Sequence, residues 1–406
     1  MRRALVGIAK GTFNVIYRLA SSKERRNEVV FLSRQADEPR YDFVQLAEAF
    51  RKRGWQTTMH LKKVRTRNLP VYAFHVLKEL RLLGRCKLAV LDRYDPVVSL
   101  VDFDCETPVQ DGPPDRPNRE FPVKPVVIQL WHAYGAFKKF GYQSVDTIEG
   151  HSADFTSTFR IHRNYSWAVC SGAGARADFA EAFGCPESRV VAMDRPEYDE
   201  LARQAKRRSE MQAQRTAELD EGARPYQILV APTLRISGES SHPVRDLYAN
   251  RENLQADVRR KLNDLGKPDV DFEIGFSFHP LEEDLPAPSN VSEQLLSCDC
   301  LVTDYSSIVY EAYLLKVPVL FYVPDLDEYR SSPGLNADPG QRCPDLCSFD
   351  ASQLAAQLAR LAADPGGYPD SELNAFAASA FAIDVPRIGS AADRLADFAI
   401  EKTRRM

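Results

Sequence analysis

Short apolar runs alternate with amphipathic stretches in the first half of the chain. The segment NEVVFLSR, residues 27–34, is rich in β-branched residues and ends in a polar turn, as a buried strand does. The segment FVQLAEAFRKR, residues 43–53, has helical spacing and stops at Gly54. Further strands are expected at 56–64, 86–92 and 126–130, and a helix at about 74–83. Strands that alternate with helices predict a parallel sheet with helices on both faces.

The same pattern recurs after a charged, helix-prone stretch at about 201–224. Apolar strands are expected at 226–235, 272–280, 299–307 and 317–325, with helix-forming sequence between them. At 406 residues the chain is too long for one ordinary core. We therefore expect an α/β protein of two doubly wound, Rossmann-like domains with an interdomain cleft. Ligands of such sheets bind beyond the carboxyl ends of the strands.

The expected boundaries follow from these patterns. They are an N-terminal domain at 27–205, a linker at 206–225, a C-terminal domain at 226–385 and a C-terminal helix at 386–406. The first 26 residues stand apart, because they hold seven Lys or Arg against one Glu, with apolar residues at roughly helical spacing. This predicts either a basic amphipathic helix on an anionic membrane face or a helix packed on its own domain.

Composition narrows the class of protein. A hydrophobic content of 44% with 27% charged residues is typical of a folded protein, and the net charge of −4 argues against a nucleic-acid binder that works through bulk charge. No apolar run approaches the roughly 20 residues that cross a bilayer. The eight cysteines lack the paired spacing of a zinc site, so we expect reduced thiols and no metal.

Candidate chemistry follows the strands of the second half. In the turn TDYSS, Thr303 and Asp304 end an apolar strand, and Ser306 and Ser307 open a helix. Serines at a helix start cap free backbone amides, and the same amides attract anions. Capping alone is the alternative interpretation, although it leaves the neighbouring threonine and aspartate unexplained.

Two other strand ends add to this set. His279 of SFHP follows one strand, and Thr233 and Arg235 of APTLR follow another. A lone histidine is often only a structural hydrogen-bonding group, but an arginine offers a forked, permanent charge to phosphate. These residues together favour a phosphorylated, nucleotide-like ligand. Neither GxGxxG after a strand nor GxxxxGK[ST] is present, which argues against dinucleotide dehydrogenases and P-loop enzymes.

The first half contributes LWHAYGAFKKFG, residues 130–141. His132 follows the strand VVIQL, and Lys138 and Lys139 come shortly after as possible charge for a substrate. A neutral imidazole can accept a proton from an attacking hydroxyl at physiological pH. A base on one half and a phosphate cradle on the other describe group transfer from a nucleotide-activated donor.

At this point the motifs resemble a known family, the CDP-glycerol glycerophosphotransferases of teichoic acid and polyol-phosphate glycan synthesis. VVFLSRQADEP, LWHAYGAFKKFG, APTLR, SFHP and DCLVTDYSSIVYEAYLLKVPVLFYVPDLDEY stand in the family's order over about residues 27–335. The resemblance implies a GT-B-type fold. It also implies that an acceptor hydroxyl attacks the β-phosphorus of CDP-glycerol or CDP-ribitol, and that CMP leaves.

The resemblance also implies roles for individual residues. His132 would be the general base, and His279 would contact the donor's phosphates. The diphosphate would be held by Arg235, Thr303, Ser306 and Ser307, and the cytidine or the cradle by Asp304 and Glu311. One motif departs from the family's GxPRxD turn, because DRPEYDEL at 194–201 has Asp194 for the glycine and Glu197 for the arginine. Arg195 could compensate, but the identity of the polyol is left open.

The implied partners are a CDP-polyol and a lipid-linked saccharide or polyol-phosphate acceptor at the cytoplasmic face of the cell membrane, with no nucleic acid. No cofactor is indicated with certainty; Mg²⁺ stays open, because Asp102 and Asp104 form a short acidic pair. Two alternatives remain. One is a GT-B glycosyltransferase that uses a nucleotide sugar, and the other is an inactive nucleotide-binding module of a cell-envelope assembly complex.

Overall fold

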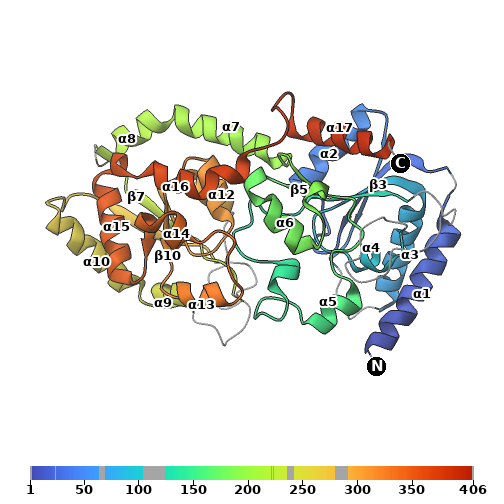
Figure 1. Cartoon of the computed structure of the whole chain (residues 1–406). Coiled ribbons are helices and arrows are strands. Elements are labelled where there is room, and N and C mark those ends of the chain that lie inside the picture. The colour runs from blue at the N-terminus through green and yellow to red at the C-terminus, as the bar shows by residue number, and fades with distance from the viewer. Residues whose placement is uncertain are drawn as a thin grey trace. The chain divides into compact units, whose positions relative to one another are not determined.

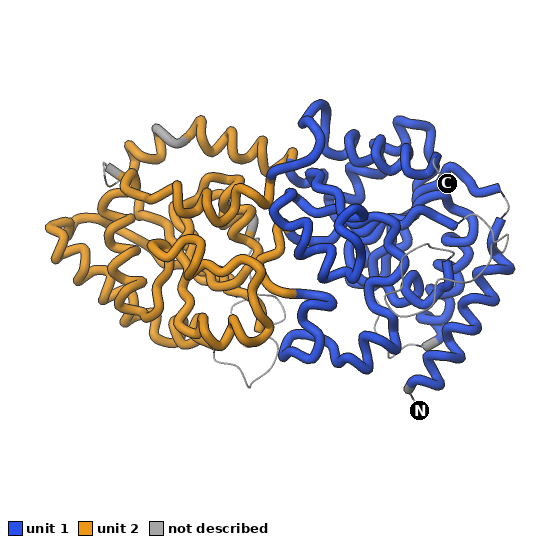
Figure 2. Tube along the Cα trace, viewed as in Figure 1, with its two compact units in different colours: residues 1–133, 140–198, 382–406 blue, residues 134–139, 199–381 orange. Residues whose placement is uncertain are grey.

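The computed structural model describes residues 2–22, 24–63, 69–103, 124–220, 222, 224–235, 242–278 and 291–404. The chain forms two compact units (Figure 2). Unit 1 comprises 1–133, 140–198 and 382–406, and unit 2 comprises 134–139 and 199–381. Each unit is built on one parallel sheet with helices around it (Figure 1), which confirms the α/β class.

The sheet of unit 1 has six strands in the order β2-β1-β3-β4-β5-β6. Their bounds are β1 Arg26–Ser33, β2 Gln56–Leu61, β3 Cys86–Leu91, β4 Val126–Gln129, β5 Trp167–Cys170 and β6 Val190–Ala192. In β1, Val29 and Phe31 belong to one core cluster, and the alternating Val30 and Leu32 are equally buried. Because alternate residues face opposite sides of a sheet, both faces are sealed.

The helices of unit 1 cover this sheet. They are α1 Arg2–Ala20, α2 Tyr41–Lys52, α3 Leu69–Arg85, α4 Pro96–Leu100, α5 Ala153–Phe159, α6 Arg176–Phe183 and α17 Ala391–Arg404. Strands β5 and β6 were not predicted from the sequence. They are only four and three residues long, too short for an apolar run to be distinguished from a buried loop.

The sheet of unit 2 has five strands in the order β11-β10-β9-β7-β8. Their bounds are β7 Tyr226–Val230, β8 Phe272–Phe276, β9 Cys300–Thr303, β10 Val319–Tyr322 and β11 Cys347–Ser348. All four strands predicted in this half are present but shorter. The residues that were counted as their last positions, such as 231–235, leave the sheet and carry the candidate site.

Ten helices are described in unit 2, apart from single 3-10 turns and with α7 starting two residues before the boundary. They are α7 Glu197–Glu210, α8 Gln212–Asp220, α9 Pro243–Ala249, α10 Arg251–Asp264, α11 Val291–Ser297, α12 Ile308–Leu314, α13 Leu326–Ser331, α14 Pro339–Arg342, α15 Ala351–Ala363 and α16 Asp370–Ala377.

The stretch expected as a linker is helical and packs on unit 2. Arg208 of α7 donates to the carbonyls of Leu296 (2.6 Å) and Cys298 (2.7 Å). Arg215 of α8 pairs with Asp299 at 2.8 Å. The helical character was predicted for this stretch; its arginines also bind main-chain carbonyls and a carboxylate that lie more than 80 residues further along the chain.

The C-terminal segment returns to unit 1, starting at residue 382. Helix α17 contributes Leu395, Ala396 and Ala399 to the core cluster of that unit. The buried Asp194 anchors the approach to this helix. Its carboxylate accepts two hydrogen bonds of 2.9 Å from Arg387 and one of 2.6 Å from Arg394.

Helix α1 packs on α3 within unit 1. Tyr17 is buried and accepts a hydrogen bond from Arg25 at 2.7 Å. At Gly84 of α3 an added Cβ would fall 2.7 Å from the carbonyl oxygen of Ala20, so glycine permits the close approach. The outward residues Leu5, Ile8, Val15 and Leu19 are exposed. The helix therefore packs on its own unit and still presents apolar side chains to solvent. None of the described helices combines the length and apolar character needed to cross a membrane.

The anchoring role of Asp194 can be tested by urea denaturation. Asp194→Ala should lower the free energy of unfolding by about 3 kcal/mol, because it leaves two arginines without their buried carboxylate. The matched control is Asp397→Ala, which also removes an ion pair of α17, with Arg53 at 2.7 Å, but whose carboxylate is 67% exposed. That change should cost less than about 1 kcal/mol. Equal costs for the two variants would contradict the prediction.

Candidate functional site

The candidate base lies in a turn directly after β4. Trp131 has a positive φ of 61°, which bulky residues rarely adopt. Its amide donates to Oε1 of Gln129 at 2.9 Å, and Nε2 of this fully buried glutamine donates to the carbonyl of Arg93 at 3.0 Å. The indole stacks on Phe140 with ring centroids 4.9 Å apart. Trp131 therefore packs, as a structural residue would, and it also fixes the turn that carries His132.

Burial and positive charge together keep His132 neutral. Burial lowers the pKa of His132 well below its usual value, and Arg93, Arg40 and Arg195 lower it further. A hydrogen bond to the backbone of Asp92 acts in the opposite direction. The Nδ1 atom of His132 is buried and has no hydrogen-bond partner among the described residues. The imidazole therefore offers an unprotonated nitrogen in a positive field, which suits a base acting on an anionic substrate.

The residues that depart from the family turn form a network inside unit 1. Arg195 donates to Asp42 through Nε at 3.0 Å and to Glu197 through Nη2 at 2.6 Å. The amide of Glu197 donates to the other oxygen of Asp42 at 2.7 Å. Burial raises the pKa of Glu197, and Arg195 opposes this rise. Glu197 thus serves as a partner of Arg195, whose charge also reaches His132.

In unit 2, Arg235 lies between two carboxylates and two aromatic rings. It pairs with Asp304 at 3.2 Å and with Asp325. Its guanidinium carbon is 5.5 Å from the ring centroid of Tyr305 and 5.0 Å from that of Tyr329. These two rings stack 3.7 Å apart. The charge of Arg235 is already balanced, so a phosphate would have to compete with the carboxylates; its phosphate role stays a prediction.

The ends of β7 and β9 are joined by hydrogen bonds. Asp304 accepts from the amide of Thr233 at 2.7 Å, and the hydroxyl of Thr303 donates to the carbonyl of Ala231 at 2.7 Å. Burial raises the pKa of Asp304, and Arg235 opposes this rise. Thr303 and Asp304 are each 1% exposed. They position the turns, and direct contact with a ligand stays a prediction for both.

The remaining predicted residues of the second half differ in placement. Ser306 accepts a long bond of 3.5 Å from the amide of Ile308, and Ser307 makes no side-chain capping bond. Both serines and Glu311 are half-buried. Conventional capping is therefore weak here, and an anion at these hydroxyls stays a prediction. His279 lies outside the described residues.

Lys138 and Lys139 belong to unit 2, although the sequence places them beside His132. Lys138 forms a bridge with Leu335, and the amide of Lys139 donates to the carbonyl of Gly334 at 3.0 Å. The ammonium group of Lys138 lies 5.9 Å from the ring centroid of Tyr329, the same ring that Arg235 approaches. Lys139 is exposed. The motif that contains His132 thus also supplies a cation, Lys138, close to Arg235 in unit 2.

A small pocket of unit 2 adds two residues that sequence reasoning missed. It brings His242 and Arg245 to Arg235, and its lining comprises Pro232, Thr233, Arg235, His242, Val244, Arg245, Phe278 and Asp304. Burial, Arg235 and Arg245 all lower the pKa of His242. The only signal in the sequence was a second His-Pro pair, at 242–243, which does not directly follow a predicted strand.

The acidic pair considered for Mg²⁺ is only partly described. Asp102 is engaged by Arg160 at 2.7 Å and by Lys10 at 3.2 Å, and Asp104 lies outside the described residues. Two cations already balance Asp102, so this carboxylate offers little to a metal ion.

Two α/β units, each built on a parallel sheet, have the architecture of the GT-B class. The family described as CDP-Glycerol:Poly(glycerophosphate) glycerophosphotransferase matches residues 15–384, and the chain belongs to it. The chain is similar over 99% of its length to the wall teichoic acid polymerase TagF, covering 95% of that structure with a TM-score of 0.63 and 18% identity. This likeness confirms the fold.

Curated relatives agree with the family. The teichoic acid ribitol-phosphate primase of Bacillus spizizenii is 29% identical over 81% of this chain and 82% of its own length. The teichoic acid glycerol-phosphate primase of Bacillus subtilis is 24% identical over 70% of this chain and 68% of its own length. The poly(ribitol-phosphate) polymerase of B. spizizenii is 32% identical, but the chain covers only 33% of it. The chain is thus an enzyme of a phosphotransferase family whose members include primases and polymerases.

The positive field at His132 can be measured by NMR titration of the histidine ring protons, with the His132 signal identified in His132→Gln. In the wild type this ring should remain neutral down to a pH below about 6.5, the ordinary pKa of histidine. Arg93→Gln should raise the pKa of His132, because it removes one of the positive charges that disfavour the imidazolium. Arg51→Gln, an exposed arginine on α2, should leave it unchanged. If the pKa of His132 were unchanged in Arg93→Gln, the proposed effect of the positive field on His132 would be wrong.

Proposed function

We propose that the enzyme transfers glycerol phosphate or ribitol phosphate from the CDP-activated polyol to a hydroxyl of a lipid-linked or glycan acceptor, in teichoic acid or capsule-like polymer synthesis. The observation that carries the proposal is the neutral, half-buried His132 in a field of arginines, in a chain of this family. The ribitol-phosphate primase shares more residues with this chain than the glycerol-phosphate primase does, so CDP-ribitol is the first donor to test.

Unit 1 would supply the base. The acceptor hydroxyl attacks the β-phosphorus of the donor and gives its proton to the imidazole of His132. A new oxygen–phosphorus bond forms, the bond between the β-phosphorus and the bridging oxygen breaks, and CMP leaves with the electron pair. Arg40 and Arg93 would hold an anionic acceptor near the base. Such a transfer depends on position and charge, because little covalent chemistry is required of the protein.

Unit 2 would hold the donor. The positive charge of Arg235 and Arg245, with His242 beside them, supports binding of a diphosphate at this strand end, and His279, Ser306 and Ser307 are further contacts predicted by the family resemblance. The pocket that these residues line is closed, so side chains would have to move to admit the ligand. Lys138, whose ammonium group lies near the ring of Tyr329, would add positive charge to this donor site. Because Asp304 and Asp325 already pair with Arg235, the bound diphosphate would compete with both carboxylates for it.

The role of His132 is tested with purified protein, CDP-ribitol or CDP-glycerol and candidate glycolipid acceptors, with products identified by mass spectrometry. His132→Ala should abolish transfer and leave binding of the CDP-polyol within a few-fold of the wild type. Turnover near that of the wild type would refute its role as base. Wild-type protein that consumes UDP-sugars instead would favour the glycosyltransferase alternative, and protein that binds CDP-polyol without any transfer would favour the binding module.

The donor pocket is tested by calorimetry with CDP-glycerol and CDP-ribitol. Arg245→Ala and His279→Ala should each weaken donor binding about tenfold or more and lower turnover, because each removes a group predicted to contact the phosphates. Arg251→Ala, which removes an exposed arginine from the neighbouring helix α10, is the matched control and should bind normally. Normal binding in both site variants would place the donor elsewhere.

Helix α1 would attach the enzyme to the inner, cytoplasmic face of the cell membrane. Leu5, Ile8, Val15 and Leu19 are 57–84% exposed and follow helical spacing that places them on one face. Arg3 and Lys10 lie on the opposite side of the helix, where they line a groove with Ser157 and Thr158 of α5 and pair with Asp154 and Asp102. The support for this attachment is therefore the exposed apolar face, within an N-terminal segment of seven Lys or Arg, because such a helix can lie on anionic lipid.

Membrane attachment is tested by co-sedimentation with phosphatidylglycerol vesicles. Leu5→Glu/Ile8→Glu should lose binding by at least tenfold, because it places two charges on the apolar face, while activity on a soluble acceptor is retained. Leu265→Glu, at a hydrophobic residue of unit 2 that is 47% exposed, is the control and should bind as the wild type does. Unchanged sedimentation of the double variant would end this part of the proposal.

A further inference from the structure

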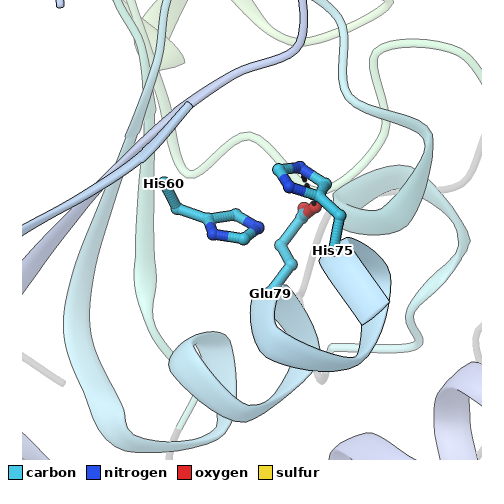
Figure 3. A group of neighbouring side chains, drawn as sticks. All are labelled: His60, His75 and Glu79. Atoms are coloured by element: carbon cyan, nitrogen blue, oxygen red, sulfur yellow. Dashed lines mark ion pairs between the residues drawn. The ribbon is translucent and has the colours of Figure 1, made fainter. Parts of the chain in front are cut away.

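A cluster of two histidines and a glutamate lies inside unit 1, among residues that the transfer reaction does not use (Figure 3). His60 comes from β2, and His75 and Glu79 stand one turn apart on α3, which places them on the same face of that helix. The ligand atoms of all three lie within 4.8 Å of one another. The two imidazole rings stack with centroids 3.9 Å apart.

The cluster is buried and its polar atoms are unsatisfied. The exposed fractions of His60, His75 and Glu79 are 4%, 8% and 1%. Nε2 of each histidine and both carboxylate oxygens of Glu79 lack a hydrogen bond of normal geometry among the described residues, although the Asp95 carboxyl is near Glu79. Nε2 of His75 lies 3.9 Å from Oε2 of Glu79. Buried polar atoms without partners are costly, so four that converge on one point call for an explanation.

The electrostatics of the cluster favour a cation. Burial lowers the pKa of His60 to about 3 and also lowers that of His75, so both rings are neutral and their lone pairs are available. Burial and the neighbouring Asp95 raise the pKa of Glu79 well above its usual value, and Arg34 opposes this rise. A divalent ion would satisfy all three side chains at once and hold Glu79 as the carboxylate.

We propose that His60, His75 and Glu79 bind a divalent transition-metal ion of the zinc class. Two imidazole nitrogens and one carboxylate oxygen suit zinc, whereas Mg²⁺ and Ca²⁺ prefer oxygen ligands. Zinc bonds of about 2.0–2.2 Å would bring the ligand atoms to roughly 3.3 Å from one another. Because a metal lies in the plane of each imidazole that binds it, the two rings would have to rotate out of their stacked arrangement. The fourth position is left for a water molecule or for Asp95.

The ion would act as a clamp in the fold. Strand β2 is the edge strand of its sheet and is hydrogen-bonded only to β1, among the strands described. A metal held by His60 on β2 and by two residues of α3 would tie this edge to a helix of the same unit. Because the unfolded chain does not present the three ligands together, metal binding would stabilise the folded state by mass action.

The test uses the full-length chain without an affinity tag, stripped with EDTA and dialysed. Zn²⁺ titration by calorimetry should show one equivalent bound with micromolar or tighter affinity, and the Tm should rise with Zn²⁺. Co²⁺ should produce the intense visible absorption of a four-coordinate site. Mg²⁺ and Ca²⁺ should do neither. Absence of stoichiometric binding by Zn²⁺ and Co²⁺, or equal responses to Mg²⁺, would overturn the proposal.

Variants separate this site from adventitious binding. Glu79→Gln and His75→Ala should each weaken Zn²⁺ binding at least a hundredfold and remove the rise in Tm. His151→Asn, which removes an exposed histidine of the same unit, is the matched control and should bind one equivalent. Glu79→Gln should melt, without metal, at or above the wild-type Tm, because it removes a buried, unpaired carboxyl group. Full Zn²⁺ binding by both site variants would refute the assignment.

Discussion

The structure depends on one constraint, which is that each unit is built on a parallel sheet buried on both faces. Charged groups cannot be accommodated on such faces without partners, so they collect where the strands end. His132 follows β4, Arg235 follows β7 and Asp304 follows β9. Central strands such as β9 and β10 are accordingly almost wholly apolar and buried, whereas the edge strands β2 and β8 carry polar residues and are only partly buried. The candidate site residues are therefore placed at the carboxyl ends of the strands of the two sheets.

Burial acts differently on the two candidate half-sites. In unit 1 it leaves His132 neutral, with nearby arginines whose charges make protonation still less favourable. In unit 2 the buried positive charge of Arg235 requires negative charges beside it, and Asp304 and Asp325 supply them. The first arrangement keeps the imidazole unprotonated, and the negative charge of a bound anion would offset the arginines and make the ring a better proton acceptor. The second requires an anionic ligand to exchange one set of negative charges for another, a natural source of selectivity for a diphosphate over a weaker anion.

The residues that depart from the family turn have become structural. Asp194 receives two arginines from the C-terminal segment, and Glu197 shares Arg195 with Asp42. Asp194 is thus part of a network that holds the approach to α17, and Glu197 is part of one that holds the turn containing Arg195. Charge that other family members are expected to direct at a ligand is here partly used within unit 1.

The sequence by itself determined the α/β class, most of the strands, the family and the residues at the strand ends, because apolar periodicity and short motifs are local properties. It could not determine which segments pack together or which side chains pair across the chain. The tertiary structure decided that 134–139 belongs to unit 2, that α17 belongs to unit 1, and that Asp42 pairs with Arg195, far along the chain. It also brought His60 to His75 and Glu79. Periodicity records that a residue is buried, but only the folded chain specifies what it is buried against.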